Sequence, residues 1–121
     1  MDKWQGLDSF WNSFDIPAYD ENSVPDDATM PYITYTAEIS KFEDVLLLNA
    51  SIWYRSTSWT DASQKAEQIA RTLASYHLVK LDNREYIFIT QGNPFAQRMK
   101  DEDDSVKRIF LNVMAEYFSA H

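Results

Sequence analysis

Few side chains in this chain could carry out nucleophilic or acid–base catalysis. A hydrolytic triad needs a base within hydrogen-bond reach of a nucleophile, and a third group that orients the base. The only histidines are His77 and His121, and there is no cysteine. His77 lies at a predicted helix-to-strand junction, where a cation interacts favourably with the helix dipole. We therefore interpret His77 as structural, and the lack of cysteine excludes disulfides, thiolate metal sites and cysteine nucleophiles.

Carboxylates are more numerous, and one run of them could hold a hard cation. Asp101, Glu102, Asp103 and Asp104 are consecutive, and Ca²⁺ and Mg²⁺ prefer carboxylate oxygens. Calcium loops, however, space their ligands and include a turn-forming glycine, which this run lacks. The sequence therefore favours a solvated acidic loop, and we expect neither a metal nor a cofactor.

Two further kinds of catalytic site have little support. Glycoside cleavage needs only two carboxylates at the right separation in space, so the sequence leaves it open, with Trp53, Tyr54 and Trp59 as a candidate sugar platform. A glycine-rich phosphate cradle is excluded, because Gly6 and Gly92 are the only glycines. We therefore expect that the protein is not an enzyme.

The hydrophobic periodicity and the turn-forming residues predict the elements that position these side chains. The predicted helices span 2–14 and 61–76, the predicted strands 31–39, 45–56, 77–81, 85–90 and 105–118, and the predicted long loops 15–30 and 91–104. Asp61 and Gln64 are spaced as a capping box at the start of the second helix. The order predicts an α+β fold, in which a mostly antiparallel sheet of four to five strands carries a main helix on one face and a short N-terminal helix.

Aromatic residues make up 15% of the chain, and two clusters of them allow two interpretations each. The N-terminal helix, with Trp4 and Trp11 on one stripe, either packs on the domain's own sheet or docks on a neighbouring subunit. The run 53–55, followed by Trp59, forms either two-sided sheet packing or an interface, where tryptophan and tyrosine are enriched.

Length and charge narrow the class of protein. A chain of 121 residues corresponds to one domain, 1–121. The net charge of −8 disfavours binding to nucleic acids through phosphate contacts and binding to anionic membranes. No apolar run is long enough to span a bilayer, and the N-terminus lacks the features of a signal peptide. We expect a soluble protein with no membrane partner.

Several motifs, taken in order, resemble a known family. They are Pro17-Ala18-Tyr19, Val24-Pro25-Asp26-Asp27-Ala28, Pro31-Tyr32-Ile33-Thr34-Tyr35, Trp53-Tyr54-Arg55, Ile69-Ala70, Gly92-Asn93-Pro94-Phe95-Ala96-Gln97, Arg108, Asn112 and Glu116-Tyr117. The chain resembles, over about 8–121, the tail terminator or tail completion proteins of long-tailed bacteriophages and prophages, often labelled minor capsid or tail component proteins.

This resemblance implies a structural protein of the virion tail that is made in the cytoplasm of the bacterial host. Such proteins are α+β domains that assemble as a hexameric ring on the head-proximal end of the tail tube. The ring ends polymerisation of the tube protein and presents a surface to the head–tail connector or stopper protein. DNA passes through the ring without specific binding, and the family has no catalytic activity.

We expect the contacts within the ring and with the tube to involve aromatic, cationic and apolar side chains of the second loop and its surroundings. The predicted interface residues are Trp4, Trp11, Trp59, Phe95, Arg98, Met99 and Lys100. The acidic run 101–104 is predicted to form a loop or to line the lumen, where negative charge lets DNA pass without sticking.

Two alternatives remain open besides an enzyme. The chain could be a head completion or head–tail joining protein of the same particle. It could also be a small acidic module that binds and neutralises a basic protein, as an immunity protein does, because its size and net charge of −8 fit that role equally well.

Overall fold

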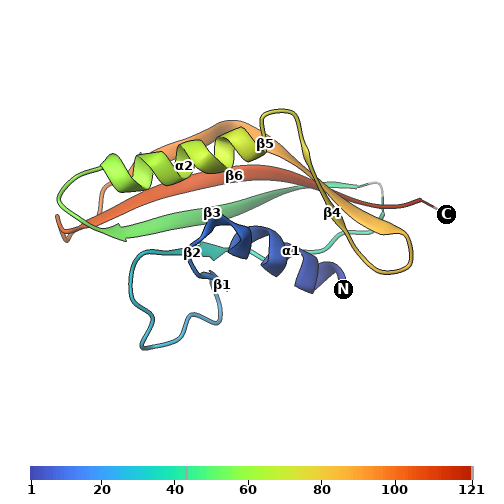
Figure 1. Cartoon of the computed structure of the whole chain (residues 1–121), viewed down its shortest axis with the longest axis horizontal. Coiled ribbons are helices and arrows are strands. Elements are labelled where there is room, and N and C mark those ends of the chain that lie inside the picture. The colour runs from blue at the N-terminus through green and yellow to red at the C-terminus, as the bar shows by residue number, and fades with distance from the viewer. Residues whose placement is uncertain (43, 121) are drawn as a thin grey trace.

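The computed structural model describes residues 1–42 and 44–120; His121 lies outside the described residues. Two helices and six strands follow one another along the described chain (Figure 1). They are α1 (Lys3–Trp11, continued by a 3-10 turn at Asn12–Phe14), β1 (Ala18–Asp20), β2 (Tyr32–Tyr35), β3 (Val45–Arg55), α2 (Thr60–Thr72), β4 (His77–Lys80), β5 (Glu85–Met99) and β6 (Val106–Ser119).

The strands form one curled, mixed sheet in the order β1-β2-β3-β6-β5-β4. β1 pairs with β2 in parallel, with Ala18 opposite Ile33. β3 pairs with β6 in antiparallel orientation over its whole length, from Val45 opposite Glu116 to Arg55 opposite Val106. The sheet is therefore built around a long central ladder, with short strands at both edges.

The predicted sheet of four to five mostly antiparallel strands with one main helix is wrong. The sheet has six strands, it includes a parallel pair, and strands dominate over two short helices. Two predicted loops contain the missed strand residues: β1 lies inside 15–30, and β5 continues through 91–99. β1 has only three residues and pairs with a strand across the loop that follows it, so no local periodicity marks it.

The capping box forms at a different helix from the one predicted. The Asp2 carboxylate accepts from the Gln5 backbone N–H, and the Gln5 side chain accepts from the Asp2 backbone N–H, both at 2.9 Å. α2 begins at Thr60, after Trp59, and has no side-chain hydrogen bond at its N-cap. Asp61 therefore lies in the first turn, where its charge interacts favourably with the helix dipole.

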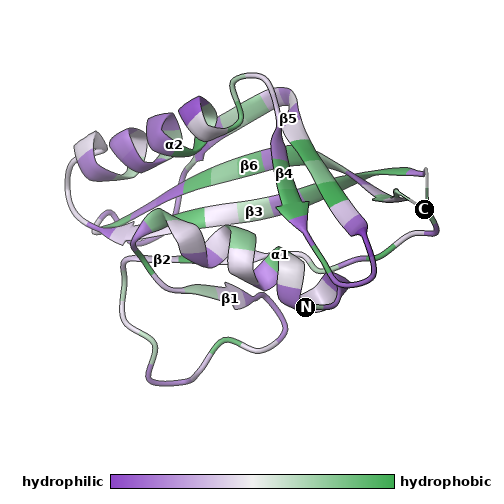
Figure 2. Cartoon of the chain, turned by 45° about the vertical axis from the view of Figure 1, so that its right-hand side comes forward, coloured by the Kyte–Doolittle hydropathy of each residue, from purple (hydrophilic) through white to green (hydrophobic). Residues whose placement is uncertain are grey.

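Both helices cover the same face of the sheet and form one core with it (Figures 1 and 2). Along β3 and β6, the apolar side chains that face the helices are buried. Those buried side chains are Leu48, Ala50, Ile52, Ile109, Leu111, Val113, Ala115 and Tyr117. The opposite face, which we call the open face, has no helix on it among the described residues. No helix in the described part of the chain is long and apolar enough to cross a membrane.

Two buried tyrosines tie the sheet to distant segments through their hydroxyl groups. Tyr35 donates to the Asp8 carboxylate of α1 at 2.9 Å, and the Trp11 ring stacks on the Tyr35 ring. Tyr117 donates to the Glu38 backbone carbonyl at 2.8 Å. Burial raises the pKa of both phenols, and the Asp8 carboxylate raises the pKa of Tyr35 further. Both hydroxyls therefore stabilise the fold in their neutral, hydrogen-donating form.

The raised pKa of Tyr117 predicts that stability falls at alkaline pH. Burial raises this pKa to about 12, whereas the unfolded phenol ionises near pH 10. The stabilising contribution is therefore complete below pH 10 and is lost as the pH rises through about 12. Tyr117→Phe should cost about 1 kcal/mol at pH 7 and should make the decline above pH 10 shallower than in the wild type.

Urea unfolding at several pH values between 7 and about 11.5 measures the free energy of unfolding of the wild type and of Tyr117→Phe. The unfolded phenol ionises within this pH range. Tyr76→Phe serves as the matched control, because the Tyr76 side chain is largely exposed. If the free energy of unfolding falls equally steeply above pH 10 in Tyr117→Phe and in the wild type, the loss of stability does not come from the Tyr117 hydroxyl.

Candidate functional site at the tip of the β5–β6 hairpin

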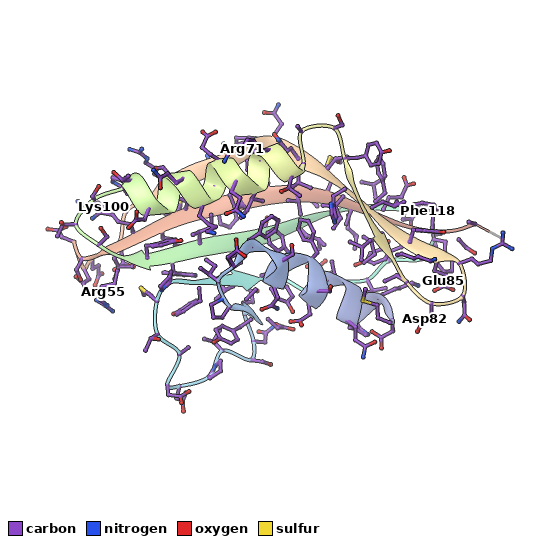
Figure 3. The ribbon with its side chains drawn as sticks, viewed as in Figure 1. Arg55, Arg71, Asp82, Glu85, Lys100 and Phe118 are labelled. Carbon is purple, nitrogen blue, oxygen red and sulfur yellow. The ribbon has the colours of Figure 1, made fainter. Side chains whose placement is uncertain are left out.

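β5 and β6 form a long hairpin whose tip, residues 100–105, lies at one end of the molecule. Figure 3 places Lys100 and Arg55 at this end, and Asp82, Glu85 and Phe118 at the other. Most of the predicted interface residues and the whole acidic run belong to this hairpin or lie beside it. We therefore examine the hairpin tip as the candidate site.

A large bulge in β5 interrupts its pairing with β6. Gln91 pairs with Val113 and Ala96 pairs with Leu111, so residues 92–95 face the single residue Asn112. Gly92 lies so close to β6 that a Cβ atom there would be 2.9 Å from the Asn112 carbonyl oxygen. Asn112 in turn donates through its side-chain amide to the Pro94 carbonyl at 3.0 Å. β5 thus regains its pairing beyond the bulge, as far as Met99.

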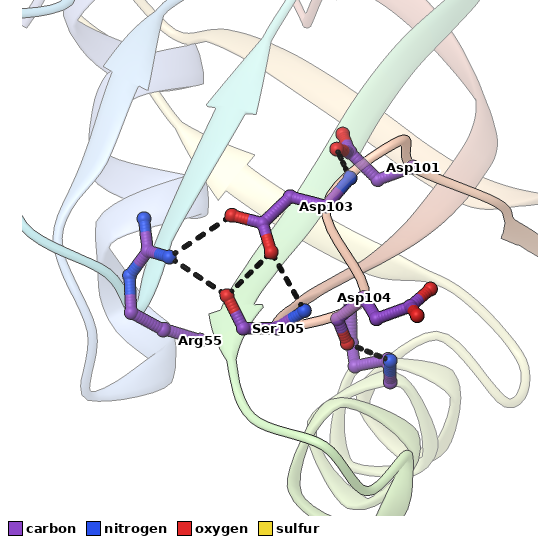
Figure 4. Close-up of polar contacts among 6 residues, drawn as sticks. Arg55, Asp101, Asp103, Asp104 and Ser105 are labelled. Carbon is purple, nitrogen blue, oxygen red and sulfur yellow. Dashed lines mark hydrogen bonds and ion pairs between the residues drawn. The ribbon is translucent and has the colours of Figure 1, made fainter.

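The acidic run closes the hairpin through its own hydrogen bonds (Figure 4). The Asp103 carboxylate accepts from the Ser105 hydroxyl at 2.7 Å and from the Ser105 backbone N–H at 2.9 Å. Arg55, at the end of β3, approaches Asp103 at 3.5 Å and donates to the Ser105 hydroxyl at 3.0 Å. Hydrogen bonds from Ser105, and to a smaller extent the charge of Arg55, lower the pKa of Asp103. The loop is therefore ordered by its carboxylates rather than only solvated.

Trp59 joins this tip from the segment between β3 and α2. The Arg98 guanidinium lies 5.1 Å from the centre of the indole ring, and the Lys107 ammonium lies 5.6 Å from it. Cations over an indole face interact favourably with the ring quadrupole. The indole and these cations line a pocket of about 420 Å³ together with Lys100, Asp101 and other residues of the tip.

The structure brings together some of the predicted site residues and separates others. Trp59, Arg98, Lys100, Asp101 and Asp104 line one pocket. The predictions missed Lys107 and Arg55, because only the pairing of β6 with β3 and β5 brings these cations to the tip. The tip therefore carries mixed charge, whereas the sequence shows a purely acidic run.

The remaining predicted interface residues do not line this pocket. Phe95 belongs to the bulge and packs partly against the core, and Met99 is 38% exposed on the open face. Trp4 is 55% exposed at the opposite end of the molecule. Trp11, in contrast, is 1% exposed and belongs to the core, so its prediction as an interface residue is wrong. The α1 helix packs on its own sheet through Trp11, while Trp4 remains exposed and could contact another protein.

The aromatic cluster around Trp53 is packed within the chain. The Trp53 indole donates to the Thr34 hydroxyl at 2.9 Å, and the Arg108 guanidinium lies 4.8 Å from the centre of the indole.

Among the described residues, no group of three or more histidine, aspartate or glutamate side chains is placed to hold a metal ion. The centre of the His77 ring lies 5.3 Å from the centre of the Phe10 ring. The hairpin tip, with paired charges around an indole, is thus suited to contact a polar protein surface.

Comparison with known proteins establishes the fold. No protein-family model matches the chain, and no curated protein matches it. A chain from the virion of a native gene transfer agent (GTA) particle has the same fold, with a TM-score of 0.59 and 16% sequence identity. The similarity covers 95% of this chain and 90% of that chain. The two chains therefore share a fold along nearly their whole length.

The hydrogen bonds at the tip predict how Asp103 titrates. NMR titration of the side-chain carboxylates should give Asp103 a pKa below that of an ordinary aspartate, because Ser105 and Arg55 stabilise its ionised form. Ser105→Ala should raise this pKa more than Arg55→Gln does, since the hydrogen bonds from Ser105 are the larger cause. The opposite order would show that the ion pair, and not the Ser105 contact, dominates the loop.

Proposed function

We propose that this protein is a structural component of a virion that caps the head-proximal end of a tail tube as a ring. In this role it ends polymerisation of the tube protein and provides the surface to which the head is joined. The observation that carries the proposal is the fold match, over 95% of the chain, to a chain from a gene transfer agent virion. The finer role, a tail terminator, draws its support from the sequence resemblance over about 8–121.

The hairpin tip supplies a surface that fits this role. Its indole and cations, Trp59, Arg98 and Lys107, form a preorganised group, since the ring and the charges already contact one another. Tryptophan and arginine dominate the binding energy of protein interfaces. We assign this surface to contacts with the tube protein or with the connector, and the adjacent carboxylates to repelling DNA phosphates.

Deletion of the gene from a particle-producing strain tests the role directly. Electron microscopy of the particles should show overlong tails without heads, because nothing stops polymerisation of the tube. A plasmid-borne wild-type copy should restore tail length and head attachment. Tails of normal length lying beside full heads would instead identify a head–tail joining protein. Normal infectious particles would contradict a virion role and favour the small acidic binding module.

Charge reversal at the tip tests the assigned surface in the same complementation assay. Arg98→Glu removes one of the two cations over Trp59 and places a carboxylate there, so the yield of infectious particles should fall at least tenfold. Arg71→Glu is the matched control, because Arg71 is exposed on α2 and makes no hydrogen bond with the tip among the described residues. Equal yields from the two variants would remove the hairpin tip from the proposed contacts.

A further inference from the structure

The open face carries an apolar patch at the end of the sheet opposite the hairpin tip. We call it the open-face patch, and its residues are Val45, Leu47, Tyr76, Leu78, Phe88 and Met114. Strand register groups these side chains into two apolar pairs: Leu47 is opposite Met114, and Phe88 is opposite Leu78. The Tyr76 ring stacks on the Phe88 ring, with 5.1 Å between the ring centres.

The exposure of this patch is unusual for a protein that acts alone. Leu47 is 59% exposed and Val45 50%, although strand positions opposite a core would ordinarily be polar. Tyr76, which directly precedes β4, is 56% exposed. Several large apolar side chains exposed on one face of a sheet are typical of an interaction site. One charged residue lies within the patch, because Glu116 stands between Val45 and Phe88. A second, Lys80, lies at its border, opposite Tyr86.

A second apolar surface lies at the same end of the molecule but on the helix side. We call it the N-terminal patch, and its exposed residues are Met1, Trp4 and Phe42. Met1 and Trp4 line a pocket of about 440 Å³ whose other walls include Ile39, Asp82 and Glu85. Asp82 and Glu85 lie at the end of the molecule where Figure 3 also places Phe118 of β6.

The charges of the two patches complement each other. The N-terminal patch offers the Asp82 and Glu85 carboxylates and the Lys3 ammonium, which lies 4.1 Å from the centre of the Phe42 ring. The open-face patch offers Lys80 and Glu116. Among the described residues, the only ion pairs join the N-terminal amine to Asp82 and Arg55 to Asp103. Lys80 and Glu116 therefore have no charged partner within the described part of the chain.

We propose that the open-face patch of one copy of this chain packs on the N-terminal patch of the next copy. The two patches lie on opposite sides of the sheet, so a symmetric pair formed through either one would leave the other exposed. A head-to-tail contact covers both, matches Lys80 with the acidic pocket, and closes into a ring where the rotation allows. The proposal deepens the ring proposed above and identifies the surfaces that build it.

Two single variants, each disabling one patch, test this arrangement. Leu47→Glu breaks the open-face patch, and Trp4→Glu breaks the N-terminal patch; both side chains are more than half exposed, so the fold should be retained. Glutamate at both sites ensures that the two altered patches repel rather than bind each other. Gln64→Glu is the control, because it adds the same negative charge at an exposed position of α2 outside both patches. Thermal unfolding verifies the fold of every variant.

Analytical ultracentrifugation over a concentration series measures the association state of the wild type and of each variant. Wild type and Gln64→Glu should associate beyond a dimer, and each patch variant alone should remain monomeric at tenfold higher concentration. An equimolar mixture of the two patch variants should form a heterodimer and nothing larger, since each retains one different intact patch. A wild type that stays monomeric throughout, a mixture that stays monomeric, or a Trp4→Glu variant that still dimerises would overturn the proposal.

This measurement separates the interface from the proposed function. Tail length in the deletion strain reports on the function, whereas sedimentation of the purified chain reports on the patches alone. Normal particles from the deletion strain together with the expected heterodimer would refute the tail role and leave the head-to-tail contact standing. Overlong tails together with a monomeric wild type would support the tail role and refute these surfaces.

Discussion

The pairing of β3 with β6 is the constraint on which the rest of this structure depends. It runs from Val45 opposite Glu116 to Arg55 opposite Val106, and it determines which side chains face the helices. Because side chains alternate along a strand, a shift by one residue would turn the buried row of β3 to solvent. The core under α1 and α2, the open face and the position of Arg55 at the hairpin tip all follow from this register.

A sheet covered on one face only has different surfaces at its two ends. At one end, Trp59 and the cations of the tip form a compact group with mixed charge. At the other, the open-face patch and the N-terminal patch lie on opposite sides of the sheet. In the arrangement that we propose, the patched end joins copies to one another while the hairpin tip meets other components of the particle. Self-assembly and attachment would then use separate surfaces.

Electrostatics within the chain differ from what the net charge of −8 indicates. The acidic run is not a uniform negative surface, because Asp103 contacts Ser105 and Arg55, and Lys107 donates to the Asp104 carbonyl. Such exposed contacts add little stability individually, but they fix the shape of the loop and the place of its charges. The cations near Trp59 come from separate positions in β5 and β6, which the register brings together.

The sequence alone determined the features that depend on neighbouring residues. Periodicity predicted both helices and the two long strands that form β3 and β6. Tertiary structure decided what depends on distant partners. β1 exists because β2 offers it a pairing edge, and β5 crosses Gly92 and Pro94 because Asn112 accommodates the bulge. Trp4 and Trp11 share one helical stripe, yet only Trp11 stacks on Tyr35 and is buried in the core. Periodicity predicts which face of the helix a side chain lies on, but the packing of the sheet against that face determines whether the side chain is buried.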